Sequence, residues 1–163
     1  IIKLEFKKRE STSIDKSTFI ISKELADDII ACDFMANSEK LKNDSKIVKA
    51  LIKLKSIGYR PRVIVEYDRE AYTLPFGNTR ITIDKNLRSY NNETELFSIK
   101  YPSYPILDDN LHILEVKFTN YLPQSVKYLL NSIDAIPHSI SKYTLCQKYI
   151  NPRPWTDNLS VPF

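Results

Sequence analysis

Three short segments of this chain each place a cation and an acid on the same side of an expected strand. In each, polar and apolar residues alternate, so the charged side chains share one face and the apolar side chains the other. The segments are 3–7, with Glu5 and Lys7; 80–84, with Arg80 and Asp84; and 111–119, with Glu115 and Lys117. We expect the apolar faces to pack beneath helices. The three polar faces predict a sheet closed around a charged interior.

Most of the residues that could do chemistry are cations. Several cations buried together without partners are unstable, so such a cluster persists where a polyanion fills it. A phosphate chain is suitable, because Arg and Lys side chains clamp phosphate oxygens. A carboxylate among the cations suits a divalent metal ion, which takes its other ligands from phosphate and water. The candidates are the cations Lys7, Lys16, Arg69, Arg80, Lys117 and Lys142 and the acids Glu5 and Glu115. The alternative is that these charges form ordinary surface ion pairs.

The periodicity along the chain predicts an α+β protein. Alternating segments predict strands, and apolar residues three and four positions apart predict helices. The expected strands are 2–8, 16–21, 62–73, 79–83 and 111–119, with 94–100 as a looser candidate. The expected helices are 23–34, 38–57, 123–133, and one from Ser139 or Ser141 to 150. We expect a polar turn at 9–15 and a tail at 152–163 that wraps the surface.

Composition narrows the classes of function. The 163 residues fit one domain, and the net charge of +4 is too small for a polybasic protein. Two glycines exclude a Gly-rich phosphate loop, and no apolar run could span a bilayer. Cys32 and Cys146 are expected to be buried thiols. The ten tyrosines are not interleaved with basic residues on one strand face, so nucleic acid is not an expected partner.

Four motifs, in this order, resemble the VTC domain of vacuolar transporter chaperone complexes and of bacterial polyphosphate polymerases. They are YDREAY at 67–72, RITID at 80–84, ILEVKF at 113–118 and SKY at 141–143. That domain is a triphosphate tunnel metalloenzyme, in which antiparallel strands close into a basic tunnel with helices outside. The resemblance covers residues 1–151, and it implies an antiparallel β-tunnel. The family's domain begins with further strands that carry a lysine and an Arg-x-Arg pair. No residue before Lys3 supplies them, so we expect this chain to build part of the tunnel.

The resemblance implies roles for the candidate residues. Lys7 and Lys16 are similar to tunnel lysines, and Glu5 would be an additional acid. Glu115 is similar to the metal-binding glutamate. Ser141 and Lys142 lie where a helix N-terminus would help to bind an anion. The residues expected to contact phosphate are Lys7, Lys16, Arg69, Arg80, Lys117, Ser141 and Lys142; those expected to act in catalysis are Arg69, Arg80, Lys117 and Lys142.

The activity implied by the resemblance is transfer of the γ-phosphate of ATP to a growing polyphosphate chain, with Mn²⁺ or Mg²⁺. Catalysis would depend on positioning and charge neutralisation, because the attacking phosphate oxygen is already anionic. Two alternatives stay open: a tripolyphosphatase that uses water as acceptor, and a module that binds polyphosphate without turnover. The expected location is cytoplasmic, and attachment to the inner face of a membrane through a membrane-protein partner is left open.

Overall fold

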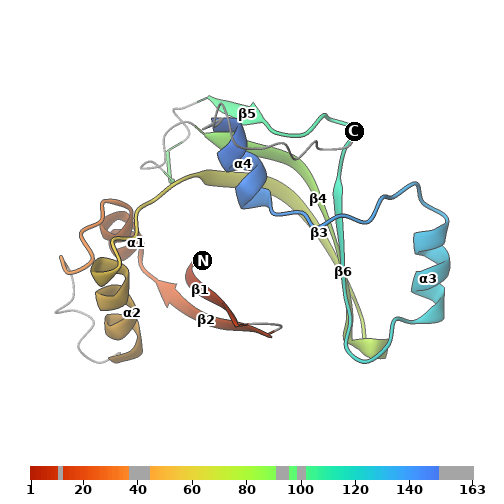
Figure 1. Cartoon of the computed structure of the whole chain (residues 1–163), viewed down its shortest axis with the longest axis horizontal. Helices are drawn as coiled ribbons and strands as arrows, with labels where there is room; N and C mark the ends of the chain where they lie inside the picture. The colour runs from red at the N-terminus through yellow and green to blue at the C-terminus, as the bar shows by residue number, and fades with distance from the viewer. Residues whose placement is uncertain (11–12, 37–44, 91–95, 99–101, 151–163) are drawn as a thin grey trace. The chain divides into compact units, whose positions relative to one another are not determined.

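The computed structural model describes residues 1–10, 13–36, 45–90, 96–98 and 102–150. Contacts divide the chain into two compact units, Ile1–Arg62 and Val63–Phe163. The described strands form two separate antiparallel sheets, one in each unit (Figure 1). The α+β class and the antiparallel pairing are therefore confirmed. The described strands close no barrel, so the expected tunnel stays a prediction.

The first unit is a hairpin with two helices. Strand β1 (Ile2–Glu10) pairs with β2 (Ser13–Ile21), and the helices are α1 (Lys23–Ile30) and α2 (Ser45–Ser56). Ser22 caps α1 by accepting a hydrogen bond from the backbone N–H of Leu25 at 3.2 Å. The apolar face of the hairpin packs with the helices, as predicted for segment 3–7; this core includes Leu4, Phe6, Phe19, Leu25, Leu51 and Leu54. The opposite face of the hairpin carries Glu5, Lys7 and Lys16.

The second unit is organised around β4 (Thr79–Tyr90). This strand pairs with β3 (Ile64–Leu74), β5 (Ser103–Pro105) and β6 (Ile113–Lys117), so it lies in the middle of the sheet (Figure 1). A short 3-10 helix, η2 (Phe76–Asn78), connects β3 to β4. The helices α3 (Gln124–Asn131) and α4 (Lys142–Ile150) follow β6. Among the described residues, no helix combines the length and the apolar character needed to cross a membrane.

Helix α4 packs on the face of the sheet that was expected to be polar. It contacts β3 and β4 (Figure 1). Cys146 of α4 is fully buried in a cluster with Leu87 and Ile113. Ile113 lies on the same side of β6 as Glu115, because the two are two residues apart. On the opposite side, Leu114 and Val116 are half-buried, and Phe118 just beyond β6 is 50% exposed. Helix α4 therefore packs on the side of the sheet that carries the charged residues, because Ile113 makes the start of that side of β6 apolar.

Several expected boundaries differ from the observed ones. The strands β1 and β2 extend into 9–10 and 13–15, where a turn was expected, because antiparallel pairing satisfies the backbone of these polar residues. Strand β4 extends past 83 to Tyr90, and the short strand β5, which was not expected, forms at Ser103–Pro105. Helix α1 ends at Ile30 and α3 at Asn131. The start of the expected helix 38–57, most of the candidate strand 94–100 and the tail 152–163 lie outside the described residues.

The cysteines are free thiols, as expected. Cys146 is buried, and Cys32 is half-buried. Burial raises the pKa of the Cys146 thiol, which keeps it protonated and inert at neutral pH.

Candidate functional site

One face of the β3–β4–β6 sheet carries most of the candidate residues; we call it the charged face. Residues directly opposite each other in antiparallel strands point to the same side of the sheet. The cross-strand pairs on this face are Arg69 with Asp84, Thr82 with Glu115, and Arg80 with Lys117. With Lys142 from α4, the charged face has four cations and two carboxylates, a net charge of +2. Register alone thus brings Arg69, Arg80, Glu115 and Lys117 onto one surface, as strand parity predicted.

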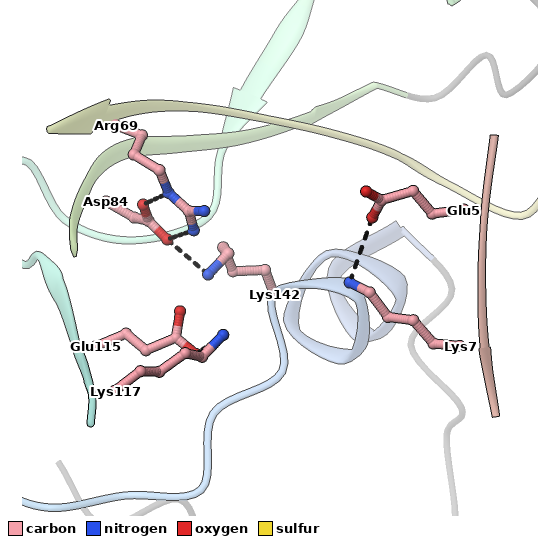
Figure 2. A network of polar contacts seen from close by, with 7 residues as sticks. All are labelled: Glu5, Lys7, Arg69, Asp84, Glu115, Lys117 and Lys142. Atoms are coloured by element: carbon pink, nitrogen blue, oxygen red, sulfur yellow. Dashed lines mark hydrogen bonds and ion pairs between the residues drawn. The ribbon is translucent and has the colours of Figure 1, made fainter. Parts of the chain in front are cut away.

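The centre of the ion-pair network is Asp84, a residue whose site role was not predicted. Its side chain is fully buried and accepts two hydrogen bonds from Arg69, from Nε at 2.6 Å and from Nη2 at 2.7 Å. Lys142 Nζ lies 2.6 Å from the same oxygen, Oδ2, that accepts from Arg69 Nη2 (Figure 2). Burial alone would raise the pKa of Asp84, but the hydrogen bonds from Arg69 and Lys142 outweigh it and lower the pKa. Asp84 therefore stays ionised and holds two cations together.

The start of α4 brings Lys142 to the sheet. Ser141 precedes the helix and accepts a hydrogen bond from the backbone N–H of Thr144 at 3.3 Å, as an N-cap does. This cap fixes the first turn, from which Lys142 reaches Asp84 (Figure 2). The hydroxyl oxygen of Ser141 thus accepts a hydrogen bond from the backbone of α4, although the residue itself is exposed.

Tyr67 supports both cations of this network. The guanidinium carbon of Arg69 lies 5.0 Å from the centre of its ring, and Lys142 Nζ lies 5.1 Å from it. These distances are in the range of cation–π attraction, which stabilises a partly desolvated cation. Tyr67 also packs against the core around Cys146, so the ring links the charged network to the apolar interior.

Glu115 and Lys117 form an ion pair on β6, with Lys117 Nζ 3.0 Å from Glu115 Oε1. Burial of Glu115 would raise its pKa, but the hydrogen bond from Lys117 and the charges of Lys117, Lys142 and Arg69 lower the pKa. The ionised carboxylate of Glu115 is therefore stabilised by Arg69 and Lys142 as well as by its neighbour Lys117. Arg80 is exposed, and it makes no ion pair within the described part of the chain.

Thr82 lies between the two groups of charges and carries a buried hydroxyl, Oγ1, that has no hydrogen-bond partner among the described residues. Its cross-strand partner is Glu115. A hydroxyl and a carboxylate are hard oxygen donors of the kind that Mg²⁺ and Mn²⁺ accept. In the described ranges, no three His, Cys, Asp or Glu residues gather to form a complete metal site. The chemistry of this pair therefore fits a metal ion that takes its remaining ligands from phosphate and water.

The hairpin of the first unit repeats the pattern of the charged face. Lys7 and Lys16 lie directly opposite each other. Glu5 lies two residues before Lys7 on the same strand, and its carboxylate is 2.7 Å from Lys16 Nζ and 3.9 Å from Lys7 Nζ. The hydrogen bond from Lys16 lowers the pKa of Glu5. All three side chains are exposed or nearly so, which makes each pair weak by itself. These three residues belong to the first unit, so they form a second group of candidates, distinct from the charged face of the second unit.

Sequence reasoning overlooked Asp84, Tyr67 and Thr82 as site residues. Part of the signal for Asp84 was present: counting outward from the turn at 74–79 puts Arg69 opposite Asp84. The contacts of Tyr67 and Asp84 with Lys142 depend on how α4 packs, which no local pattern encodes.

The fold and this site define an α+β protein whose antiparallel sheet carries a cation-rich face built around a buried carboxylate. The chain belongs to the VTC domain family, because the model of that family matches residues 1–151. Membership of this family indicates a function related to polyphosphate. The searches of curated proteins and of solved structures give no match.

Proposed function

We propose that this chain contributes a polyphosphate polymerase site, in which the γ-phosphate of ATP is transferred to a growing polyphosphate chain. The observation that carries the proposal is the pairing of Arg80 with Lys117 across β4 and β6. Like charges directly opposite each other destabilise a sheet. Glu115 lies 3.0 Å from Lys117, but Arg80 makes no ion pair with a described residue, so a bound anion would offset the repulsion that remains. A polyphosphate chain has regularly spaced charges and can contact such cations in succession.

The other cations of the charged face suit the same ligand. Arg69 and Lys142 are held close together by Asp84, yet their side chains remain 31% and 21% exposed. Their ion pairs with Asp84 use only some of their N–H donors, so the rest can bind phosphate oxygens. The net charge of +2 attracts a polyanion even with both carboxylates ionised.

The reaction that we propose needs no general base. A terminal phosphate oxygen of the chain, already anionic, attacks the γ-phosphorus of ATP, and a new P–O bond forms. The bond from the γ-phosphorus to the bridging oxygen breaks, and its electron pair leaves with ADP. Arg69, Arg80, Lys117 and Lys142 would hold the phosphates in line and offset the charge that develops on the transferred group. Both histidines, His112 and His138, are exposed, and the proposal gives them no role.

Glu115 would hold a divalent metal ion, with the Thr82 hydroxyl beside it. When bound, such an ion neutralises charge on the phosphates and orients them. Lys117 donates to the same carboxylate, so it would limit where the second Glu115 oxygen points. Mn²⁺ and Mg²⁺ are the proposed ions, since both accept oxygen ligands.

The test is incubation of the full chain with ATP and Mn²⁺, followed by a gel that resolves long phosphate chains. Chains that lengthen with time, with release of ADP, are the expected result. Release of inorganic phosphate without chains would instead indicate a hydrolase, and binding of polyphosphate without either product would indicate a binding module. In the same assay Glu115→Gln should lose activity, and its matched control is Glu70→Gln, which removes a carboxylate from β3 on the opposite face of the sheet, where Glu70 pairs with Lys85.

A further inference from the structure

We propose that Asp84 is a positioning residue for phosphate binding: its buried carboxylate fixes the Arg69 guanidinium and the Lys142 ammonium as a preformed pair for a polyphosphate anion. The inference rests on the proposed phosphate-binding function of the charged face. It extends that function to an acidic residue, which by charge alone would be expected to repel the ligand.

The geometry favours a preformed pair. Oδ2 of Asp84 accepts from Arg69 Nη2 at 2.7 Å and from Lys142 Nζ at 2.6 Å, so two cations share one oxygen. A second bond, from Arg69 Nε to Oδ1 at 2.6 Å, fixes the plane of the guanidinium. Tyr67 lies 5.0 Å and 5.1 Å from the two cationic groups and restricts them further. Without Asp84, the two positive charges would repel each other and separate.

The network also joins segments that are distant in the sequence. Arg69 comes from β3, Asp84 from β4 and Lys142 from the first turn of α4. A long, flexible lysine side chain loses much rotational freedom when it binds an anion. Here that freedom is already restricted before a ligand arrives, which is how preorganisation increases affinity.

A purely structural ion pair is the competing explanation, and the two differ in what they predict for binding. If Asp84 only stabilises the fold, a folded variant without its charge should bind a polyanion as well as before, or better, because the net charge of the face rises. If Asp84 positions the two cations, the same variant should bind more weakly despite its greater positive charge.

The experiment is calorimetric titration of the full chain with inorganic tripolyphosphate, without ATP or metal, at 0.15 M salt. The variant is Asp84→Asn, which has nearly the same shape but no charge. The matched control is Glu70→Gln on the outer face of the same sheet, where Glu70 binds Lys85 at 2.6 Å. Both variants raise the net charge by one, so they differ only in the position of the lost carboxylate. Circular dichroism checks that each is folded at the temperature of the titration.

We expect Asp84→Asn to weaken binding about tenfold, the effect of losing one charge-assisted contact, while Glu70→Gln stays within about twofold of the unmodified chain. Equal or tighter binding by folded Asp84→Asn would overturn the inference. If that variant does not fold, Asp84→Glu replaces it, because glutamate keeps the charge and leaves both cations intact but moves the carboxylate by one methylene group relative to Arg69 and Lys142. A similar loss of affinity then supports positioning, and unchanged affinity overturns it.

The same titration separates this inference from the proposed polymerase activity. An unmodified chain that binds tripolyphosphate but makes no polyphosphate from ATP would contradict the polymerase and leave the role of Asp84 standing. An unmodified chain that makes polyphosphate, combined with normal binding by Asp84→Asn, would contradict only the positioning role. No binding by the unmodified chain would overturn both.

Discussion

Arg80 on β4 lies directly opposite Lys117 on β6, and both side chains point to the charged face. Lys117 has Glu115 as a partner at 3.0 Å, whereas Arg80 makes no ion pair in the ranges that the structure describes. The same arrangement occurs in the other sheet, where Lys7 opposes Lys16 beside Glu5. Two independent sheets thus place two cations across from each other next to a single carboxylate, which is a pattern suited to an anion and a metal ion together.

Arg80→Ala should weaken polyphosphate binding more than it affects stability. The arginine has no ion pair with a described residue to lose, but it offers a planar group that can bind two phosphate oxygens. We expect about a tenfold loss of affinity for tripolyphosphate and little change in the melting temperature. Arg88→Ala is the control, since Arg88 is exposed on the same strand next to the buried Leu87 and so points to the other face. Equal losses in the two variants would contradict a specific role for Arg80.

Glu115→Gln should remove metal-dependent turnover and leave phosphate binding largely intact. The amide keeps the shape of the side chain, but it lacks the charge that a divalent ion needs from its one carboxylate ligand. Measurements of chain synthesis over a range of Mn²⁺ concentrations, and of tripolyphosphate affinity without metal, separate the two effects. Normal metal-dependent synthesis by the variant would show that Glu115 is only the ion-pair partner of Lys117.

Stability should depend on pH through Asp84. Its pKa in the folded chain is below the ordinary value of 3.8, because hydrogen bonds from Arg69 and Lys142 outweigh the effect of burial. A lowered pKa means that the stabilisation is fully present above pH 3.8 and is lost as the pH falls through the folded-state pKa.

Asp84→Asn should therefore reduce the free energy of unfolding by about 3 kcal/mol at pH 7, as expected when one partner of a buried ion pair is removed. The difference from the unmodified chain should shrink as the pH falls below about 4, because the unfolded chain then binds a proton at this aspartate while the folded chain resists it until the lower folded-state pKa. Urea unfolding of the unmodified chain and of Asp84→Asn at pH 7 and pH 3 measures this difference in the free energy of unfolding. A difference that stays constant between these two values would mean that the charge of Asp84 contributes nothing to stability.

Gly77→Ala should destabilise the chain more than Gly58→Ala. Both glycines have positive φ, +65° and +64°, where an alanine costs about 1 kcal/mol. At Gly77 an added Cβ would also lie 2.5 Å from the backbone oxygen of Tyr121, whereas at Gly58 nothing lies within 4 Å. We expect at least about 1 kcal/mol more destabilisation at Gly77, from overpacking against a fixed backbone. Thermal unfolding of the two variants provides the comparison, and equal losses would show that the turn after β3 can shift.

Strand parity was predictable because alternation is a local property of the sequence. It correctly put Arg80 with Asp84, and Glu115 with Lys117, on shared faces. It could not show that β4 continues past 83, because Asn86 has a positive φ of 52° and the β3–β4 register shifts between Glu66 and Asp68. Such an irregularity interrupts the two-residue period from which the strand was recognised.

The contents of the site were less predictable than its position. Lys142 was predicted as a phosphate ligand, but its contact with Asp84 depends on the packing of α4 around Cys146. A buried carboxylate between two cations has no sequence signature, since Asp84 is spaced along its strand like any surface residue. Tertiary packing, rather than local pattern, decides which of the charges on a polar face become an internal network.

The central place of β4 limits how this domain can change in length. The strand is paired along both edges, with β3 on one side and β5 and β6 on the other. One residue inserted or deleted within 80–84 would exchange Arg80, Thr82 and Asp84 for Ile81 and Ile83 on the charged face. A single substitution in this segment changes one side chain, whereas an insertion or deletion moves every side chain beyond it to the other face. Length variation among natural relatives, and the grafting of tags or reporter loops, should therefore be confined to connections outside this strand.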